Sequence, residues 1–556
     1  MEILSVLMVH NINKRLIILV FSFFLIFNIA SSGGHFDVWD GVEAFLVTES
    51  MVLKHSAKLY PDLPSINKLS FNIRYVVWFL KSSEDKKLYN YETIPLEPVY
   101  SFRSLFLSAI AAPFYYLAII SSISPVAVVG LFVNSLLTSL TSLVIFCFSF
   151  EVYKSNKIAV VLSLIFGLCS FVWAYNSTLW PQPLQTLCLI ASAFFIYLSL
   201  HRHSSFICHY TRVNRKDNNH DTYNNAKRDS IKGIYFAGLG GLFLGLSVFA
   251  HPSSLILIPG FVAYSIFSMR RNSRELISFV IVLAIILFLI GLVNYSRFGS
   301  FAEFGYFYYG TLSAHGGWIG LWGLLASPGA GLIFYFPIVI LLPIAFRYFY
   351  RENKGLFLLF SYTLIVTWLF AGTLYFGGRQ GDRAWGGGAE AWGPRYLVPV
   401  LPFITVVLGT LFLHMRKGLI LKLAIIISLC GAGFIVNLLG KLIWYGLDYG
   451  LYLQTHAPTI STTTSPYDPM TWNPSYSPIV LHAKALMDNY ASYLQHDWYQ
   501  SFLWNTYGLA PCSYDIYLFC KFGIIPVLLL SAVIAVLAVF IIMELRTRSP
   551  QKKEQV

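Results

Sequence analysis

The chain has 556 residues, of which 56% are hydrophobic and only 12% are charged, and its formal net charge is +13. A soluble domain carries about 25% charged residues, so this composition excludes an ordinary water-soluble protein and requires lipid as the main solvent. The positive charge lies in short segments between apolar runs, as in cytoplasmic loops, which argues against nucleic acid as a partner.

Twelve apolar runs approach the length of roughly 20 residues that crosses a bilayer. They fall near 16–30, 126–149, 158–176, 183–200, 233–250, 254–268, 275–294, 332–346, 355–376, 397–413, 419–437 and 522–543. The first run follows Lys14 and Arg15 and is interpreted as an uncleaved helix, because so many spans come after it. We therefore predict an all-α polytopic membrane protein with 12 or 13 transmembrane helices.

A further apolar stretch, Leu105 to Ser122, is ambiguous. If it does not fully cross, the later basic clusters all lie on the same side as Lys14 and Arg15. These clusters are 154–157, 201–232, 270–274, 347–354, 416–422 and 546–553. The positive-inside rule thus favours a re-entrant or interfacial segment interrupted by Pro113, with both termini in the cytoplasm.

This topology places four polar segments on the outer side of the membrane. They are 31–104, 295–331, 377–396 and 438–521. The 201–232 linker, rich in Asn, Asp, Arg and His, is expected to be a disordered cytoplasmic tether. In the last outer loop Cys512 and Cys520 either pair as a disulfide or remain thiols.

Acidic residues follow the first helix as Asp37, Asp40 and Glu43. Carboxylates three residues apart share one face of a helical turn, and a carboxylate near a low-dielectric boundary suits a general base. The alternative is a capping box, with Asp40 as the N-cap and Glu43 three residues on. Spacing alone leaves both interpretations open.

The segment 377–396 combines seven glycines with three arginines, two acids and two tryptophans. Glycines allow close approach of the backbone to a ligand, and arginines bind phosphate through two hydrogen bonds. We therefore favour ligand binding, with snorkelling of Arg395 to lipid headgroups as the alternative. His251 and Asn294 lie at outer helix ends, where a lone histidine is more often a satisfied interface residue than a ligand.

Several stretches together resemble the GT-C superfamily of polyprenyl-phosphate-sugar-dependent glycosyltransferases, which includes protein O-mannosyltransferases and the aminoarabinose transferase of lipid A. Uncharacterised prokaryotic membrane glycosyltransferases of this type are the more similar branch. The stretches lie at 175–180, 294–300, 320–328, 331–337, 392–402 and 473–478. Their order along residues 16–480 carries the resemblance.

The resemblance implies a GT-C-like core and an inverting transfer at the outer face of a prokaryotic cell membrane. Asp40 matches the first-loop acid, with Asp37 as the alternative. The donor would be a polyprenyl-phosphate sugar, the acceptor a lipid, glycan or protein, and a divalent metal is compatible but not required. The candidate substrate-binding residues are Arg395, Arg383, Glu390, Trp392, Arg103, His251 and Asn294.

The chain also departs from the family pattern. The first-loop acids are spaced Asp-x-x-Asp rather than adjacent, His251-Pro252 replaces an Arg-Pro pair, and Glu390 is additional. The expected division is a catalytic membrane region at 1–437, an outer loop at 438–521 for acceptor recognition, and a last helix with a basic tail at 522–556. The alternatives are a multi-pass transporter or lipid-handling protein, a noncatalytic relative, and an oligosaccharyltransferase, whose Trp-Trp-Asp-Tyr-Gly signature is absent.

Overall fold

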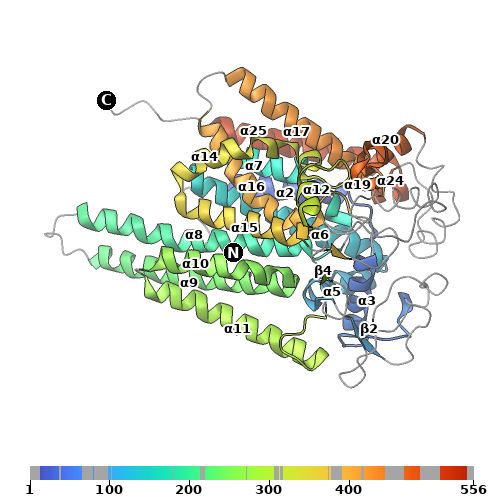
Figure 1. Cartoon of the computed structure of the whole chain (residues 1–556), viewed down its shortest axis with the longest axis horizontal. Helices are drawn as coiled ribbons and strands as arrows, with labels where there is room; N and C mark the ends of the chain where they lie inside the picture. Colours follow the sequence, from blue (N-terminus) through green and yellow to red (C-terminus); the bar gives the residue numbers. More distant parts are fainter. Residues whose placement is uncertain are drawn as a thin grey trace.

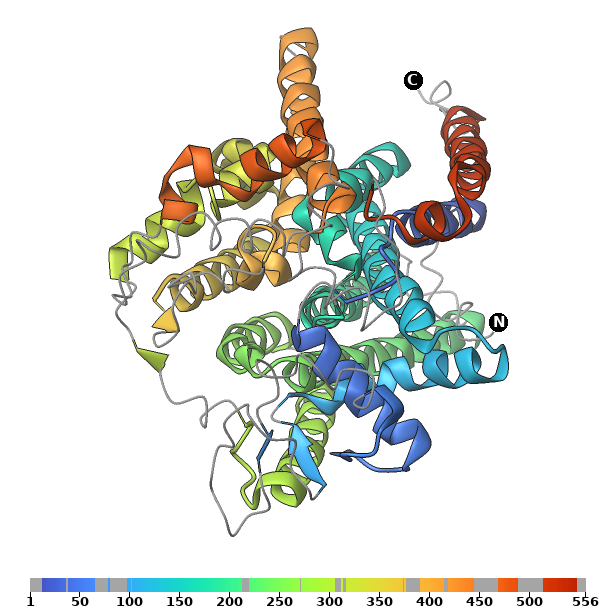
Figure 2. The same ribbon diagram turned by 90° about the vertical axis from the view of Figure 1, so that its right-hand side faces the viewer.

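The computed structural model is an elongated bundle of helices whose short strands all lie at one end (Figure 1). Seen from that end, several helices run along the line of sight (Figure 2). The structure describes residues 13–36, 39–65, 79–80, 98–101, 103–177, 179–212, 220–270, 272–305, 312–313, 317–373, 375–376, 391–414, 419–444, 469–488 and 514–547.

The first half of the chain forms most of the longer helices. In order they are α2 (Lys14–Ala30), α3 (Trp39–Leu53), α5 (Leu105–Ile120), α6 (Pro125–Tyr153), α7 (Asn156–Cys169), η2 (Phe171–Ser177), α8 (Gln182–Arg212), α9 (His220–Ala250), η3 (Pro252–Leu257), α10 (Ile258–Met269) and α11 (Ser273–Phe298).

The second half alternates shorter and longer helices. They are α12 (Gly317–Ala326), α13 (Leu332–Tyr335), η6 (Pro337–Leu341), α14 (Leu342–Glu352), α15 (Lys354–Thr373), η7 (Arg395–Val400), α16 (Leu401–Leu413), α17 (Leu419–Leu442), α19 (Pro469–Trp472), η8 (Pro474–Tyr476), α20 (Pro478–Met487), α24 (Tyr517–Phe522) and α25 (Ile524–Thr547).

Nine helices of the described residues are long and apolar enough to cross a membrane, which confirms the predicted all-α polytopic class. The other three predicted runs are helical but short or divided. The run at 16–30 is the 17-residue α2, the run at 158–176 divides into α7 and η2, and the run at 332–346 divides into α13, η6 and α14. The count of twelve spans stays a prediction.

Two local expectations are wrong. The helix α5 continues through Pro113 without a break, since a proline removes one backbone donor but the surrounding turns keep their hydrogen bonds. The 201–232 linker is mostly helical, because α8 continues to Arg212 and α9 begins at His220. Adding a residue to an existing helix is far easier than starting a new one, so a polar segment that follows a spanning helix can extend it.

The helix ends that flank the basic segments and the described elements of the polar segments lie at opposite ends of the bundle. The C-terminal end of α8, the N-terminal ends of α9 and α11 and the α14–α15 turn lie at the left of Figure 1, and the strands, α3 and α20 at the right. Separation of this kind is what the positive-inside rule requires. The orientation with both termini cytoplasmic and the interfacial position of α5 remain predictions.

The strands of the described residues are short and form two small antiparallel sheets. β3 (Val99–Ser101) pairs antiparallel with β1 (Lys58–Leu59) and β2 (Phe79–Leu80), with Leu59 opposite Val99 and Leu80 opposite Tyr100. β4 (Leu312–Ser313) pairs antiparallel with β5 (Tyr375–Phe376). The three-stranded sheet therefore fixes the segment that leads into α5.

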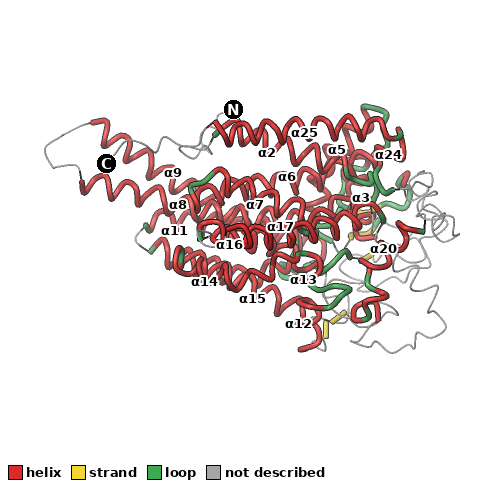
Figure 3. Tube along the Cα trace, turned by 90° about the horizontal axis from the view of Figure 1, so that it is seen from above, coloured by secondary structure: helices red, strands yellow, loops and turns green. Residues whose placement is uncertain are grey.

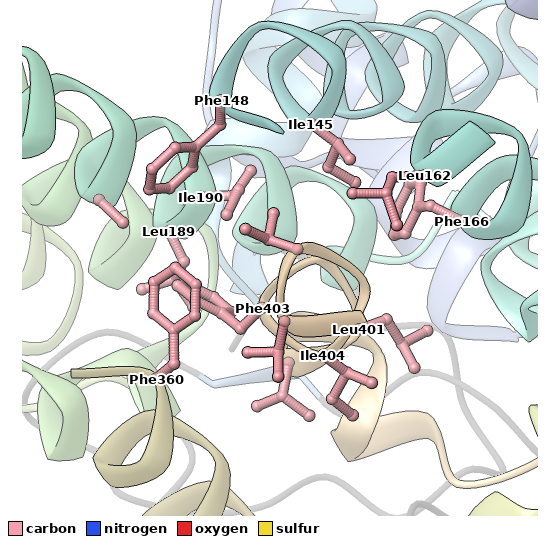
Figure 4. Packing of buried hydrophobic residues seen from close by; sticks show 14 of the residues in the cluster. Ile145, Phe148, Leu162, Phe166, Leu189, Ile190, Phe360, Leu401, Phe403 and Ile404 are labelled. Carbon is pink, nitrogen blue, oxygen red and sulfur yellow. The ribbon is translucent and has the colours of Figure 1, made fainter. Parts of the chain in front are cut away.

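The apolar core lies between α6, α7, α8, α15 and α16, where aromatic and branched side chains interdigitate (Figure 4). The apolar stretch of α8 is 89% buried within the protein, whereas that of α25 is only 6% buried. α25 lies beside α2 at one edge of the bundle (Figure 3), and its Glu544 accepts a hydrogen bond from Asn13. The interior helix α8 is therefore surrounded by protein, while α25 faces lipid.

The segment before α25 is also tied to the segment after α2. The Asp515 carboxylate lies 2.6 Å from the His35 imidazole, and the Tyr517 amide donates to the Ser32 carbonyl. Cys520 is disulfide-bonded, and Cys512 lies outside the described residues. The segment before α25 thus holds the exit of the first helix.

Candidate functional site

The acids after the first helix lie at the start of α3. This helix begins at Trp39, so Asp40 is in its first turn and Glu43 is one turn further on the same face. The Glu43 carboxylate accepts hydrogen bonds from Ser101 and Arg103 rather than from a backbone amide of the turn. The capping-box interpretation is therefore wrong, since Asp40 is inside the helix and Glu43 binds side chains.

Arg103 joins the two acids. It follows β3 directly, and the sheet directs the end of this strand toward α3. Its Nε donates to Glu43 Oε2 at 3.0 Å, and its Nη2 donates to Asp40 Oδ1. The Ser101 hydroxyl donates to the other oxygen of Glu43. One guanidinium thus fixes both carboxylates.

Arg395 contacts Asp40 from a segment 355 positions later in the chain. Its Nη2 donates to Asp40 Oδ2 at 2.7 Å, and its side chain is 10% exposed. Gly393 adopts φ +75°, a left-handed conformation that favours glycine, and with Pro394 it turns the chain into η7. The guanidinium lies 3.8 Å from the centre of the Trp180 ring, a cation–π contact that restrains its plane.

The site is therefore one carboxylate held between two guanidiniums. Burial alone would raise the pKa of Asp40, but Arg103 and Arg395 outweigh burial and hold this pKa below its usual value. Burial raises the pKa of Glu43, and the opposing effect of Arg103 does not cancel it. Asp40 is thus the ionised acid at neutral pH, and Glu43 is the more easily protonated one.

His251 faces the same charges from the turn between α9 and η3. Burial and the positive charges of Arg395 and Arg103 together lower its pKa to about 3, against the smaller opposing effect of Asp40. Its Nδ1 accepts the backbone N–H of Ser253 and caps η3. The imidazole is therefore neutral at physiological pH and has a structural partner, as the interface interpretation expected.

Of the other predicted residues, Trp392 and Asn294 are buried, and three lie outside the described residues. Trp392 is fully buried and packs at a tilt against His482, with 4.6 Å between ring centres, in the segment before Arg395. Asn294 is buried at the end of α11, where its side-chain amide donates to the Phe301 carbonyl. Asp37, Arg383 and Glu390 lie outside the described residues. Arg395 is buried and ion-paired rather than extended toward lipid headgroups.

Three residues of the site were not among the sequence candidates. They are Ser101, Trp180 and Arg297. Arg297 could have been selected from the sequence, because a charged residue at the end of an otherwise apolar span is costly and usually has a partner. Ser101 and Trp180 carry no such signal, since their roles depend on which distant residue packs against them.

A divalent metal finds no ready ligand set among the residues that the structure describes. No group of three or more His, Cys, Asp or Glu side chains is arranged there to hold one, and both oxygens of Asp40 accept from guanidiniums. Arginines neutralise these carboxylates, so the described residues do not fit the metal that the sequence left open. We derive no step through a metal.

Comparison with known proteins gives structural similarity only. No family model matches the chain, and no curated protein matches it in sequence. The fold is similar to the apo oligosaccharyltransferase of Archaeoglobus fulgidus, with TM-score 0.41, 13% identity and coverage of 78% of this chain and 61% of that chain. It is also similar to apo ArnT of Cupriavidus metallidurans, with TM-score 0.42, 11% identity and coverage of 86% and 79%.

The archaeal enzyme also appears as AglB in complex with an inhibitory peptide and a dolichol-phosphate, with TM-score 0.37, 12% identity and coverage of 78% of this chain and 61% of that chain. The chain thus spans about three fifths of the archaeal oligosaccharyltransferase that it matches. These values describe a likeness of helix arrangement, and the chemistry below is argued from the site itself.

Proposed function

We propose that this chain is a membrane glycosyltransferase that moves a sugar from a polyprenyl-phosphate donor to a hydroxyl of a lipid, glycan or protein acceptor at the outer face of the membrane, with inversion. Asp40 is the general base and Arg395 binds the donor phosphate. The supporting observation is the Asp40 carboxylate held between Arg103 and Arg395, at the end of the bundle where α3 and the short strands lie.

The location suits such a donor. A polyprenyl-phosphate sugar keeps its isoprenoid in lipid while its sugar must reach water, so its phosphate lies at the boundary. Arg395 stands at the first residue of the apolar stretch Arg395–Leu413. Its Nε is buried and has no hydrogen-bond partner within the described residues, and a buried unsatisfied donor is costly. An anionic phosphate oxygen would satisfy it.

The transfer balances with the residues of the site. The acceptor hydroxyl oxygen attacks the anomeric carbon of the sugar, and its proton passes to Asp40. The bond between that carbon and the phosphate oxygen breaks, and the lipid phosphate leaves with the electron pair. The Arg395 guanidinium stabilises the charge on this phosphate.

Donor binding would itself activate the base. Arg395 lowers the pKa of Asp40 both by its charge and by its hydrogen bond, next to the larger effect of Arg103. A phosphate that draws Arg395 away removes these two effects, and burial then raises the pKa of Asp40. The carboxylate becomes a stronger base only when a donor is present, which would limit reaction without substrate.

Two further groups are candidates for contacts with the sugar and the acceptor. Gln182, two residues after Trp180, is fully buried, and neither its amide nitrogen nor its amide oxygen has a hydrogen-bond partner in the described part of the chain. Sugar hydroxyls supply both donors and acceptors to such an amide. For the acceptor, we propose the 438–521 loop, whose α20 packs beside Trp392 through His482.

The direct test uses the full chain in nanodiscs with polyprenyl-phosphate donors that carry different labelled sugars. Photoaffinity competition measures donor binding, and release of polyprenyl phosphate measures transfer to added membrane lipid, glycan or peptide acceptors. We expect one donor class to bind and to release its lipid phosphate, with inverted configuration in the product.

Each outcome bears on the proposal. Binding of a donor that Arg395→Gln abolishes, together with transfer that Asp40→Asn abolishes, supports it. Movement of an intact donor across the bilayer without cleavage would replace the transferase with the transporter or lipid-handling alternative. Absence of binding for every donor class would overturn the proposal.

A further inference from the structure

Arg297 links a transmembrane helix to the backbone beside the proposed base. It lies at the C-terminal end of α11 and is 6% exposed. Its Nη2 donates to the carbonyl of Arg103 at 2.7 Å and also to the carbonyl of Ser101. The guanidinium therefore binds the chain on both sides of residue 102.

The two residues held by Arg297 are those that bind the acids. Ser101 donates its hydroxyl to Glu43, and Arg103 donates to Glu43 and to Asp40. The last paired residue of β3 is Ser101, opposite Phe79, so Arg103 lies beyond the sheet register. The sheet alone does not fix the backbone from which the Arg103 side chain projects.

Burying the Arg297 guanidinium is costly, because removing a charged group from water costs several kcal/mol even after relaxation. The Nη2 nitrogen carries two hydrogens, so this one atom can donate to both carbonyls.

We propose that Arg297 is a positioning residue that holds Arg103 against Asp40 and Glu43 and so sets the ionisation of the proposed base. The proposal rests on the proposed function only for the role of Asp40. Among the described residues, the charged and titratable groups that face Asp40 are Arg103 after β3, Arg395 and Tyr396 in η7, His251 before η3 and Glu43 on α3 itself. Of these, Arg103 is the one whose backbone Arg297 binds.

The test reads the ionisation of Asp40 without requiring transfer. A hydrophobic carbodiimide modifies protonated carboxyl groups, and fragmentation of the labelled peptide separates Asp40 from Glu43. The variants are Arg297→Gln and Arg297→Lys, and the matched control is Arg270→Gln, at the end of α10 on a basic linker far from the site.

We expect Arg297→Gln to label Asp40 about tenfold faster than the unmodified chain at pH 6, because a rise of one unit in pKa increases the protonated fraction tenfold. Arg297→Lys should restore most of the slow labelling, since an ammonium group can still donate to these carbonyls. Arg270→Gln should leave the rate unchanged. A structural role alone predicts lower thermal stability without faster labelling of Asp40.

Equal labelling rates in the unmodified chain and in both Arg297 variants would overturn the inference. If Arg297→Gln does not accumulate, Arg297→Lys carries the test through a smaller increase. Where transfer is found, its pH profile gives a second readout, and the acid limb of Arg297→Gln should move to higher pH. If no donor is turned over, faster labelling still supports positioning, so failure of the function and failure of the inference give different results.

Discussion

Arg395 donates a 2.7 Å hydrogen bond to the carboxylate of Asp40, which lies 355 positions earlier in the chain. The contact joins the first turn of α3 to the first turn of η7. Since Arg103 occupies the other oxygen of Asp40, the charge of this acid is controlled by two distant parts of the sequence. Four predictions follow from this site and its support.

Replacing Asp40 with Asn removes the proposed base while keeping the size of the side chain. Because a positioned general base contributes about 100-fold to 10,000-fold, we expect transfer to fall by at least about 100-fold with normal expression. The measurement is release of labelled polyprenyl phosphate from the full chain. Asp62→Asn is the control, since Asp62 is an exposed outer-loop acid paired with Lys54, and retained transfer in Asp40→Asn would exclude this residue as the base.

Replacing Arg395 with Lys keeps one positive charge but loses the planar fork and its stacking on Trp180. We expect weaker donor binding by about tenfold or more, corresponding to a loss of about 1.4 kcal/mol. Competition between labelled and unlabelled donor measures the effect, with Arg270→Lys as the control. Unchanged donor affinity in Arg395→Lys would mean that the phosphate binds elsewhere.

His251 makes folding stability depend on pH. Its pKa is lowered from 6.5 to about 3 by burial and by the nearby arginines. Below pH 6.5 the unfolded chain binds a proton that the folded site does not accept, so the stability contribution is complete above 6.5 and is lost as pH falls toward 3. At pH 5 the loss is roughly 2 kcal/mol.

The comparison uses the melting temperature (Tm) of the unmodified chain and of His251→Asn at pH 7.5 and pH 5. Asn retains an acceptor for capping η3, so we expect a smaller decrease in Tm on acidification for the variant. His482, whose pKa burial lowers to about 4, is present in both proteins and cancels. An equal decrease in both would show that His251 is protonated in the folded state.

Replacing Trp392 with Ala should destabilise the fold of the segment that precedes Arg395. The indole is fully buried, contacts Tyr335 edge-on and His482, and closely approaches Gly440. A buried tryptophan replaced by alanine costs about 3–5 kcal/mol. We expect a lower Tm and less monodisperse protein, with Trp392→Phe in between.

The control for this change is Trp318→Ala, because Trp318 is 79% exposed on α12. It should leave the Tm in detergent nearly unchanged. If both alanine variants lower the Tm equally, the effect is a general one of tryptophan removal, and Trp392 has no special role in holding the segment before Arg395.

The sequence predicted the membrane class and the separation of basic linkers from polar loops, because both are local properties. A run of apolar residues must be solvated by lipid or by other helices whatever its neighbours are. The sequence also selected Asp40 and Arg395 as candidates, since acids and arginines at helix ends are rare and costly in this setting. Its errors at Pro113 and at 201–232 came from judging single breakers and polar composition, whereas both segments are helical.

Only the tertiary structure decided which charges meet. Arg103 was a candidate for substrate binding but not for pairing with Asp40 and Glu43, Trp180 lay in a motif without an assigned role, and Arg297 was not selected at all. Ion pairs and hydrogen bonds depend on distances of a few ångströms between side chains, and these distances are set by how α3, β3, α11 and η7 pack at one end of the bundle. Hydropathy and spacing along the chain contain no measure of that packing, so the paired state of Asp40 became visible only in the folded protein.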